Sequence, residues 1–249
     1  MNDSVFRSRV KSVLNDNSFD RTVTHLKRGT IDTRSLWRVG TGSTNVFKKK
    51  TEKNGKRYSV VITVDQSGSM QQYARHDVAF ECAQYLAKNL WECGADVAVV
   101  GYNANVIVHH SLGDKVDATT NRAMLRRMNY NFHGASSPSG KVAYACNHDY
   151  EALATAYGIL KGASHGRILI HLSDGMLSCS EECGYDRPAE YDRSEFVRGY
   201  ISGMTGVSTF GVGIQSDLSS LFANSIVVDD LEQMKSQIAS LIQRNIRRG

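Results

Sequence analysis

The chain has 249 residues and a formal net charge of +5, and 41% of its residues are hydrophobic and 22% are charged. This length and composition allow one large α/β domain with a short appendage. No apolar run approaches the roughly 18 residues that suggest a membrane span, and the N-terminus lacks the apolar core of a signal peptide. We therefore predict a cytoplasmic protein with no membrane partner.

Positive charge is concentrated at the N-terminus. Residues 1–58 contain 14 Lys and Arg against 5 Asp and Glu, whereas the remaining residues contain 16 against 20. We predict a basic N-terminal arm over residues 1–57, with one short helix near 4–15, that packs on a body formed by residues 58–249. Such an arm is either a solvated extension or a contact surface for nucleic acid or an acidic protein.

From Tyr58 onward, short apolar runs alternate with longer amphipathic stretches, which is typical of a doubly wound, mainly parallel α/β sheet. The runs rich in β-branched residues predict buried strands. They are 59–65, 95–103, 167–175, 206–214 and 224–230. The run 105–112 follows a tight turn and predicts an antiparallel edge strand, in which the adjacent His109 and His110 would be one exposed and one half-buried side chain.

Amphipathic stretches between these runs predict the helices that cover the sheet. They are 75–92, 149–162, 188–203 and 231–246. The only two prolines, Pro138 and Pro188, interrupt none of these elements.

The most informative segment is VVITVDQSGSM, in which a buried strand ends at Asp65. Ligands in an open parallel sheet bind beyond the carboxyl ends of the strands, so Asp65, Ser67 and Ser69 lie where a site is expected. One carboxylate and two alternate hydroxyls are oxygen donors suited to a hard cation, and Gly68 permits the sharp backbone path between them. We predict a Mg²⁺ site here, with Mn²⁺ or Ca²⁺ as alternatives.

A second strand supplies a matching group, because RILIHLSDG ends with Ser173, Asp174 and Gly175. Asp174 would face the same edge of the sheet if the two strands are neighbours. Asp and Ser after a strand also cap helices. The two strand ends together favour a metal site.

DxSxS followed by a later SDG resembles the metal-ion-dependent adhesion site of von Willebrand factor A (VWA) domains. From about residue 28 onward the sequence is similar, more specifically, to the C-terminal VWA domain of the T subunit of aerobic cobaltochelatase. The likeness includes VDQSGSM, LWECGADVAVVGYN, NHDYEALATAYGILKG and RILIHLSDG. The T subunit is longer, so the chain resembles the stand-alone versions that bacteria and large phages carry beside a AAA+ ATPase gene; a phage-encoded chain would act in the host cytoplasm.

This resemblance implies that the third loop supplies an acidic metal ligand, Asp149 or, as second choice, Glu151; a helix N-cap role is the alternative for Asp149. It also implies a partner, a ring of MoxR-class or cobaltochelatase-type AAA+ ATPase subunits, with an acidic residue of a partner completing the metal site and a third protein as target. We expect no catalysis by the chain alone. A genuine cobaltochelatase subunit, or an RNA-binding VWA protein of the Ro type, remains an alternative.

Other signals are weaker. The segment 134–142 departs from a nucleotide-binding P-loop in its spacing and has Val142 where Ser or Thr is needed. Five cysteines in a chain of this size indicate free thiols. Cys179 and Cys183 near His171 allow a zinc site only as a minor alternative, because further ligands at zinc spacing are missing.

Overall fold

The fold is described from a computed structural model, and the residues described are 3–14, 21–51, 58–134, 147–163, 166–177 and 193–246. The chain forms two compact units. The larger unit contains residues 1–14 and 57–249, and the smaller unit contains residues 15–56.

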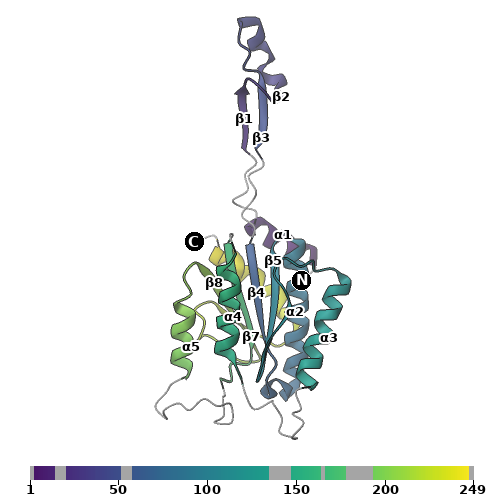
Figure 1. Cartoon of the computed structure of the whole chain (residues 1–249), viewed down its shortest axis with the longest axis vertical. Helices are drawn as coiled ribbons and strands as arrows, with labels where there is room; N and C mark the ends of the chain where they lie inside the picture. The colour runs from purple at the N-terminus through teal and green to yellow at the C-terminus, as the bar shows by residue number, and fades with distance from the viewer. Residues whose placement is uncertain are drawn as a thin grey trace. The chain divides into compact units, whose positions relative to one another are not determined.

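A six-stranded sheet in the order β6-β5-β4-β7-β8-β9 forms the centre of the larger unit (Figure 1). The strands are β4 (Tyr58–Asp65), β5 (Asp96–Tyr102), β6 (Val106–His110), β7 (Gly166–Ser173), β8 (Val207–Ile214) and β9 (Ser225–Val228). Strand β6 pairs antiparallel with β5, and the other neighbours pair in parallel. The predicted doubly wound, mainly parallel sheet with one antiparallel edge strand is confirmed.

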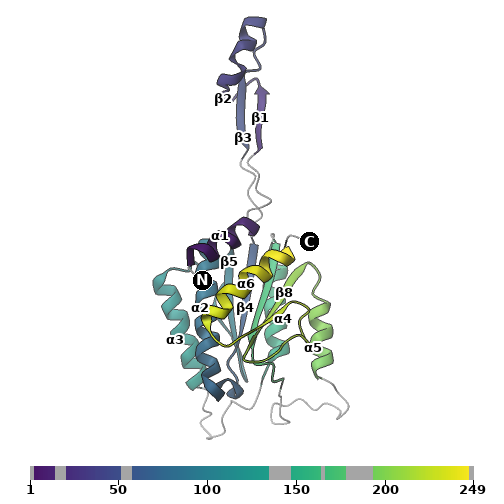
Figure 2. The same ribbon diagram turned by 180° about the vertical axis from the view of Figure 1, so that it is seen from behind.

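Helices cover both faces of this sheet. They are α1 (Asp3–Leu14), α2 (Arg75–Glu92), α3 (Ala118–Gly134), α4 (Asp149–Lys161), α5 (Arg193–Ser202) and α6 (Leu231–Ile246). Helices α4 and α5 lie on one face, and α1, α2 and α6 lie on the other (Figures 1 and 2). Alternate side chains of β4 enter the two cores, with Val60 and Ile62 on the α2 side and Val61 on the α4 side. Within the described part of the chain, no helix combines the length and apolarity needed to cross a membrane.

The predicted helices over 75–92 and 231–246 are confirmed with the same bounds, and 149–162 is confirmed to within one residue. Residues 188–192 of the predicted helix 188–203 lie outside the described residues, and α5 begins at Arg193. Helix α3 was not predicted. Its apolar side chains recur every four residues along a sequence that is otherwise polar, and Met124, Met128 and Phe132 are buried in the core shared with α2.

The prediction for the two histidines of β6 was wrong, because both are buried, with 2% of His109 and 8% of His110 exposed. The pairing of β6 with β5 passes from Val100↔Val108 to Val99↔His110, so the register skips His109. This bulge inserts one extra residue and interrupts the simple alternation of side chains between the two faces.

The smaller unit has an antiparallel sheet in the order β1-β3-β2, formed by β1 (Arg21–Leu26), β2 (Thr30–Ile31) and β3 (Phe47–Thr51). A 3-10 helix, η1 (Thr33–Thr41), follows β2. It starts at Asp32, whose carboxylate accepts hydrogen bonds from Arg34 N and Ser35 Oγ. These strands were not predicted, because the lysine-rich β3 lacks the apolar alternation that identifies a half-buried strand.

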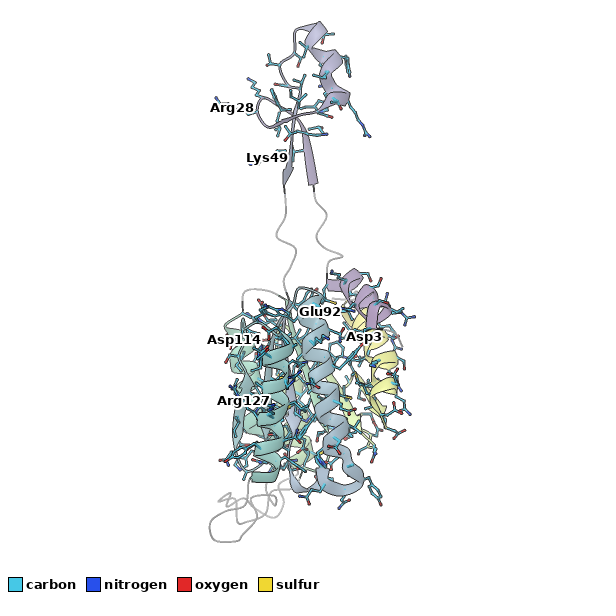
Figure 3. All side chains as sticks on the ribbon, turned by 90° about the vertical axis from the view of Figure 1, so that its right-hand side faces the viewer. Asp3, Arg28, Lys49, Glu92, Asp114 and Arg127 are labelled. Carbon is cyan, nitrogen blue, oxygen red and sulfur yellow. The ribbon has the colours of Figure 1, made fainter. Side chains whose placement is uncertain are left out.

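The helix predicted near 4–15 is confirmed as α1, and it belongs to the larger unit. Phe6 is fully buried and meets the edge of Tyr85 of α2, with ring centroids 5.2 Å apart. Arg7 forms an ion pair with Glu92, which Figure 3 shows at the end of α2 beneath α1. Helix α1 is therefore part of the core of this unit.

We expect Phe6→Ala to lower the free energy of unfolding by about 3–5 kcal/mol, because it removes a buried aromatic side chain and leaves a cavity. Val5, which is 42% exposed in the same helix, offers a matched control. Val5→Ala should change stability by less than about 0.5 kcal/mol. Urea unfolding followed by circular dichroism measures both, and equal effects would show that α1 does not dock through Phe6.

Candidate metal centre

Three strands bring polar residues together at the carboxyl edge of the sheet. Asp65 is the last residue of β4, the strand that lies between β5 and β7. The register pairs Asp65 with Tyr102, the last residue of β5. On the other side, Ser173 ends β7 and donates a hydrogen bond from Oγ to Asp65 Oδ2 at 2.8 Å. Asp65 is thus at the centre of the edge where ligands of such sheets bind.

Asp65 is fully buried, and in the described part of the chain its hydrogen bonds come from neutral groups. Oδ1 accepts from Ser67 N at 2.9 Å, and Oδ2 accepts from Ser173 Oγ and, at 3.4 Å, from Asn147 Nδ2. No Lys, Arg or His of the described residues forms an ion pair with it. A buried charge without a partner of opposite sign is costly. A cation beside Asp65 would relieve that cost.

The pKa of Asp65 reflects this environment. Burial, together with the nearby carboxylate of Asp174, raises the pKa from 3.8 to about 7, although hydrogen bonds from Ser67 and Ser173 act in the opposite direction. Without a cation, Asp65 therefore carries a proton in much of the folded population near neutral pH.

Two hydroxyl groups lie together after Asp65. Ser67 is buried, and its Oγ is 3.0 Å from Ser69 Oγ. The loop continues into a short 3-10 helix, η2 (Gly68–Ala74), which ends with Tyr73 and Ala74 at φ values of 53° and 54°. Positive φ values are unusual for residues other than glycine and cost on the order of 1 kcal/mol each. The chain accepts this strain where it turns from the loop into α2.

Asp174 follows β7 and is paired with an arginine. Its Oδ2 accepts a hydrogen bond from Arg75 Nη1 at 3.1 Å, and its Oδ1 accepts one from Met176 N at 3.1 Å. Arg75 is the first residue of α2, the helix that follows the DxSxS loop. This helix therefore places a positive charge beside Asp174 at the end of β7.

Asp149 is also fully buried and paired with an arginine. It is the first residue of α4, after the cap residue His148, so the alternative N-cap role is not what the structure shows. Its Oδ1 accepts hydrogen bonds from Nε and Nη2 of Arg193, the first residue of α5, while no partner of Oδ2 lies among the described residues. Glu151, the second choice, lies one helical turn after His148, and 3.6 Å separates Glu151 Oε2 from His148 Nδ1.

The donor set fits a hard divalent cation better than zinc. In the described part of the chain, no three His, Cys, Asp or Glu side chains come close enough together to hold a metal by themselves. The oxygens around Asp65 are those of one carboxylate and of serine hydroxyls, which suit Mg²⁺ with several waters. The nearby Asp149 and Asp174 already have arginine partners, which leaves the charge of Asp65 to be balanced.

Sequence reasoning did not identify several residues of this site. Ser173 and Asn147 bond to Asp65 directly, and Arg75 and Arg193 neutralise the outer carboxylates. The adjacent SDG signal already contained Ser173. No nearby sequence pattern identified the arginines as part of the site. Arg193, for example, is 44 residues from Asp149, which it contacts.

Gln66, between Asp65 and Ser67, holds the metal loop in place through buried hydrogen bonds. It is fully buried, and its Nε2 donates to Met128 O at 3.3 Å. Its Oε1 accepts from Asn131 Nδ2 and, at 3.2 Å, from His109 Nε2. Gly101 of β5 makes room for this group, because a Cβ there would overlap both Gln66 Oε1 and His109 Nε2. The metal loop is thereby tied to α3 and β6.

His171, which raised the zinc alternative, is used in the core. Its Nδ1 is 2.8 Å from Thr63 Oγ1 and its Nε2 is 3.1 Å from Tyr102 OH. Burial lowers its pKa to about 3, so the ring is neutral. Cys179 and Cys183 lie outside the described residues, and Cys82 and Cys93, which are described, are free thiols.

The sequence matches the family model "Cobalamin biosynthesis protein CobT VWA domain" over residues 46–247. The match starts before β4 and runs through α6, so it includes every residue of the site. No curated protein matches the sequence.

Solved structures with the same fold include two bacterial proteins. The pilus adhesin SpaC from Lactobacillus rhamnosus GG is 14% identical with a TM-score of 0.55, over 79% of this chain and 31% of SpaC. A von Willebrand factor type A protein from Catenulispora acidiphila is 17% identical with a TM-score of 0.51, over 77% of this chain and 43% of its own. The chain therefore spans less than half of either protein, and at these identities the likeness shows the fold alone.

In EDTA, we expect the contribution of Asp65 to the free energy of unfolding to fall as pH rises from about 4 to 7. The buried His109 and His171, whose pKa values are lowered to about 4 and 3, contribute in the opposite direction. The pKa of Asp65 is raised to about 7 in the folded chain, so the folded state holds a proton that the unfolded state releases near 3.8. The contribution is complete below pH of about 4, is lost as pH rises through 7, and is at most about 4 kcal/mol.

Urea unfolding at a series of pH values measures this slope. Asp65→Asn removes the Asp65 contribution, so the slope of stability against pH should become more positive over this range. Asp217→Asn should leave it unchanged, since the exposed Asp217 sits in a similar Asp-x-Ser turn and has a pKa that bonds from Ser219 lower. Equal slopes in the wild type and Asp65→Asn would contradict the prediction.

Proposed function

The chain belongs to the family of the CobT VWA domain of cobalamin biosynthesis, and from this premise we propose that it is a metal-dependent protein-binding domain. The observation that carries the proposal is the buried carboxylate of Asp65, which has no positively charged partner among the described residues and lies beside the Ser67 and Ser69 hydroxyls. In this proposal the binding domain comprises residues 58–249, and residues 1–57 are a basic N-terminal arm whose first helix, α1, packs on that domain.

We assign Asp65, Ser67 and Ser69 as the residues that would hold Mg²⁺, with Asp149 and Asp174 as the outer acidic groups. Mn²⁺ and Ca²⁺ also prefer oxygen ligands. When bound, the ion would supply a Lewis-acidic position whose waters exchange for an oxygen of a partner. Ser173 and Asn147 would then hold the Asp65 carboxylate in place.

The arginines explain how such a site would attract an acidic group. Asp174 is neutralised by Arg75 and Asp149 by Arg193, so only the charge of Asp65 would be set against the two positive charges of the ion. The occupied site would keep a net positive charge in a buried setting, where electrostatic attraction is strong. A carboxylate from a partner would complete the balance.

The partner that the family resemblance favours is a AAA+ ATPase ring of the MoxR or cobaltochelatase type. The chain would act as its non-catalytic adaptor and transmit ATP-driven changes to a third protein. A genuine subunit of a cobalt-inserting complex is the second candidate, supported by the description of the matching family. A porphyrinoid-binding subunit recovered together with the ATPase would support that second candidate.

An RNA-binding role would rest on the smaller unit. Its described residues 21–51 contain eight Lys or Arg and one Asp, which is a charge that attracts nucleic acid. The same charge also suits an acidic protein surface. We favour the protein partner, because the metal centre is the more specific of the two features.

We expect Asp65→Asn to lower the Mg²⁺ affinity by more than about 100-fold, because it removes the central carboxylate. Isothermal titration calorimetry measures this, with Asp217→Asn as the matched control that should bind as the wild type does. Unchanged affinity in Asp65→Asn would contradict the assignment.

The partner is tested by affinity purification from native cells or infected host cells. Wild type and Asp217→Asn should recover a AAA+ ATPase in Mg²⁺ and lose it in EDTA, and Asp65→Asn should not recover it. Equal recovery of the ATPase in Mg²⁺ and in EDTA would indicate an interface other than the metal centre. Recovery of RNA in place of the ATPase would favour the nucleic-acid role.

Arg75→Gln separates the charge argument from a purely structural role. Removing Arg75 leaves Asp174 unneutralised, so we expect Mg²⁺ to bind about fivefold to tenfold more tightly, while the acidic partner binds more weakly by a similar factor. A loss of both affinities would indicate that Arg75 only maintains the fold of the site.

A further inference from the structure

A groove lies between the edge strand β6 and helix α3, next to the buried Gln66 of the metal loop. It contains two cavities of about 390 and 320 Å³, which share His109 and Arg127. The larger is lined by Ile107, His109, Arg126, Arg127, Tyr130 and Asn131. The smaller continues past Arg127 to Asp114, and Figure 3 shows these two residues from the same side of the larger unit.

The groove is basic and partly apolar. Helix α3 carries Arg122, Arg126 and Arg127, which are all exposed, and the sequence of α3 contains no acidic residue. Arg126 has no ion pair within the described residues. Ile107 is 38% exposed and Tyr130 is 80% exposed at the larger cavity. A ligand that combines negative charge with an apolar group would match both features.

His109 is a buried polar residue beside both cavities. Its side chain is buried, and its Nε2 donates to Gln66 Oε1, so its Nδ1 is the unprotonated acceptor. This Nδ1 is buried and has no hydrogen-bond partner among the described residues. Buried acceptors without partners are uncommon in folded proteins. Because this atom is enclosed by protein, a ligand in the groove would be recognised by the arginines and the apolar side chains.

Arg127 divides the two cavities and stabilises the strand edge. Its Nη1 donates to the carbonyl oxygen of His109 at 3.1 Å, at the bulge of β6. One backbone acceptor of the edge is therefore already taken, which opposes the addition of a long regular strand. The groove suits a short segment that crosses it.

We propose that this groove binds a short acidic peptide segment of a partner protein. A carboxylate of the segment pairs with Arg126, and an apolar side chain packs between Ile107 and Tyr130. The apolar lining of the larger cavity favours a peptide over nucleic acid, which needs a wider run of phosphate contacts. This site is distinct from the metal centre and does not depend on the proposed function.

The test uses a pool of N-acetylated pentapeptide amides. The central residue is Phe, Leu or Val, and each flanking position is Glu or Gln in equal amounts. The full chain is immobilised in EDTA so that no metal ion is bound. The peptides that it retains should contain more Glu than Gln at the flanking positions. Arg126→Ala should reduce the affinity of the enriched peptide about tenfold, the size expected for one charge-assisted hydrogen bond.

Arg122→Ala is the matched control, because Arg122 is an exposed arginine one turn earlier in α3 and lines neither cavity. It should change the affinity less than twofold. The proposal is overturned by absence of Glu enrichment, by equal losses in Arg122→Ala and Arg126→Ala, or by tighter, Arg126-dependent binding of an octauridine RNA.

Discussion

The register that joins β4 to its two neighbours determines the chemistry of this molecule. It places Asp65 beside Tyr102 on one side and beside Ser173 on the other, at the edge where the strands end. Because β4 is buried along its whole length, the carboxylate at its end is withheld from solvent. A shift of one residue would move every side chain of the strand to the other face, so the site and the core depend on the same register.

The Asp65 carboxylate lies near two further aspartates whose charges are already paired. Of the two outer aspartates, Asp174 follows β7 and Asp149 begins α4. Each pairs with an arginine that begins another helix, Arg75 in α2 and Arg193 in α5. Helix N-termini themselves favour negative charge, so each arginine adds to a field that already stabilises a carboxylate. Among the described residues, the inner aspartate, Asp65, receives hydrogen bonds from neutral groups alone, which makes it the position that responds to a cation.

Residues that end strands could be predicted from the sequence, because apolar β-branched runs identify buried strands and the polar residues after them fall at one edge. Asp65 and Asp174 were found in this way. The inward turn of His109 could not be predicted, since a bulge depends on how two strands pair. Arg193 was missed because its contact with Asp149 joins the first residues of two helices that are far apart in the chain. The short, lysine-rich strands of the smaller unit also gave no apolar pattern to recognise.

The order of the elements has a mechanical consequence. The smaller unit is inserted between α1 and β4, so the chain enters and leaves it through two different elements of the larger unit. A pulling force on the smaller unit would be divided between α1, held by side-chain packing on α2 and α6, and the central strand β4, held by hydrogen bonds on both sides. The load that reaches β4 would act along the strand that ends at Asp65.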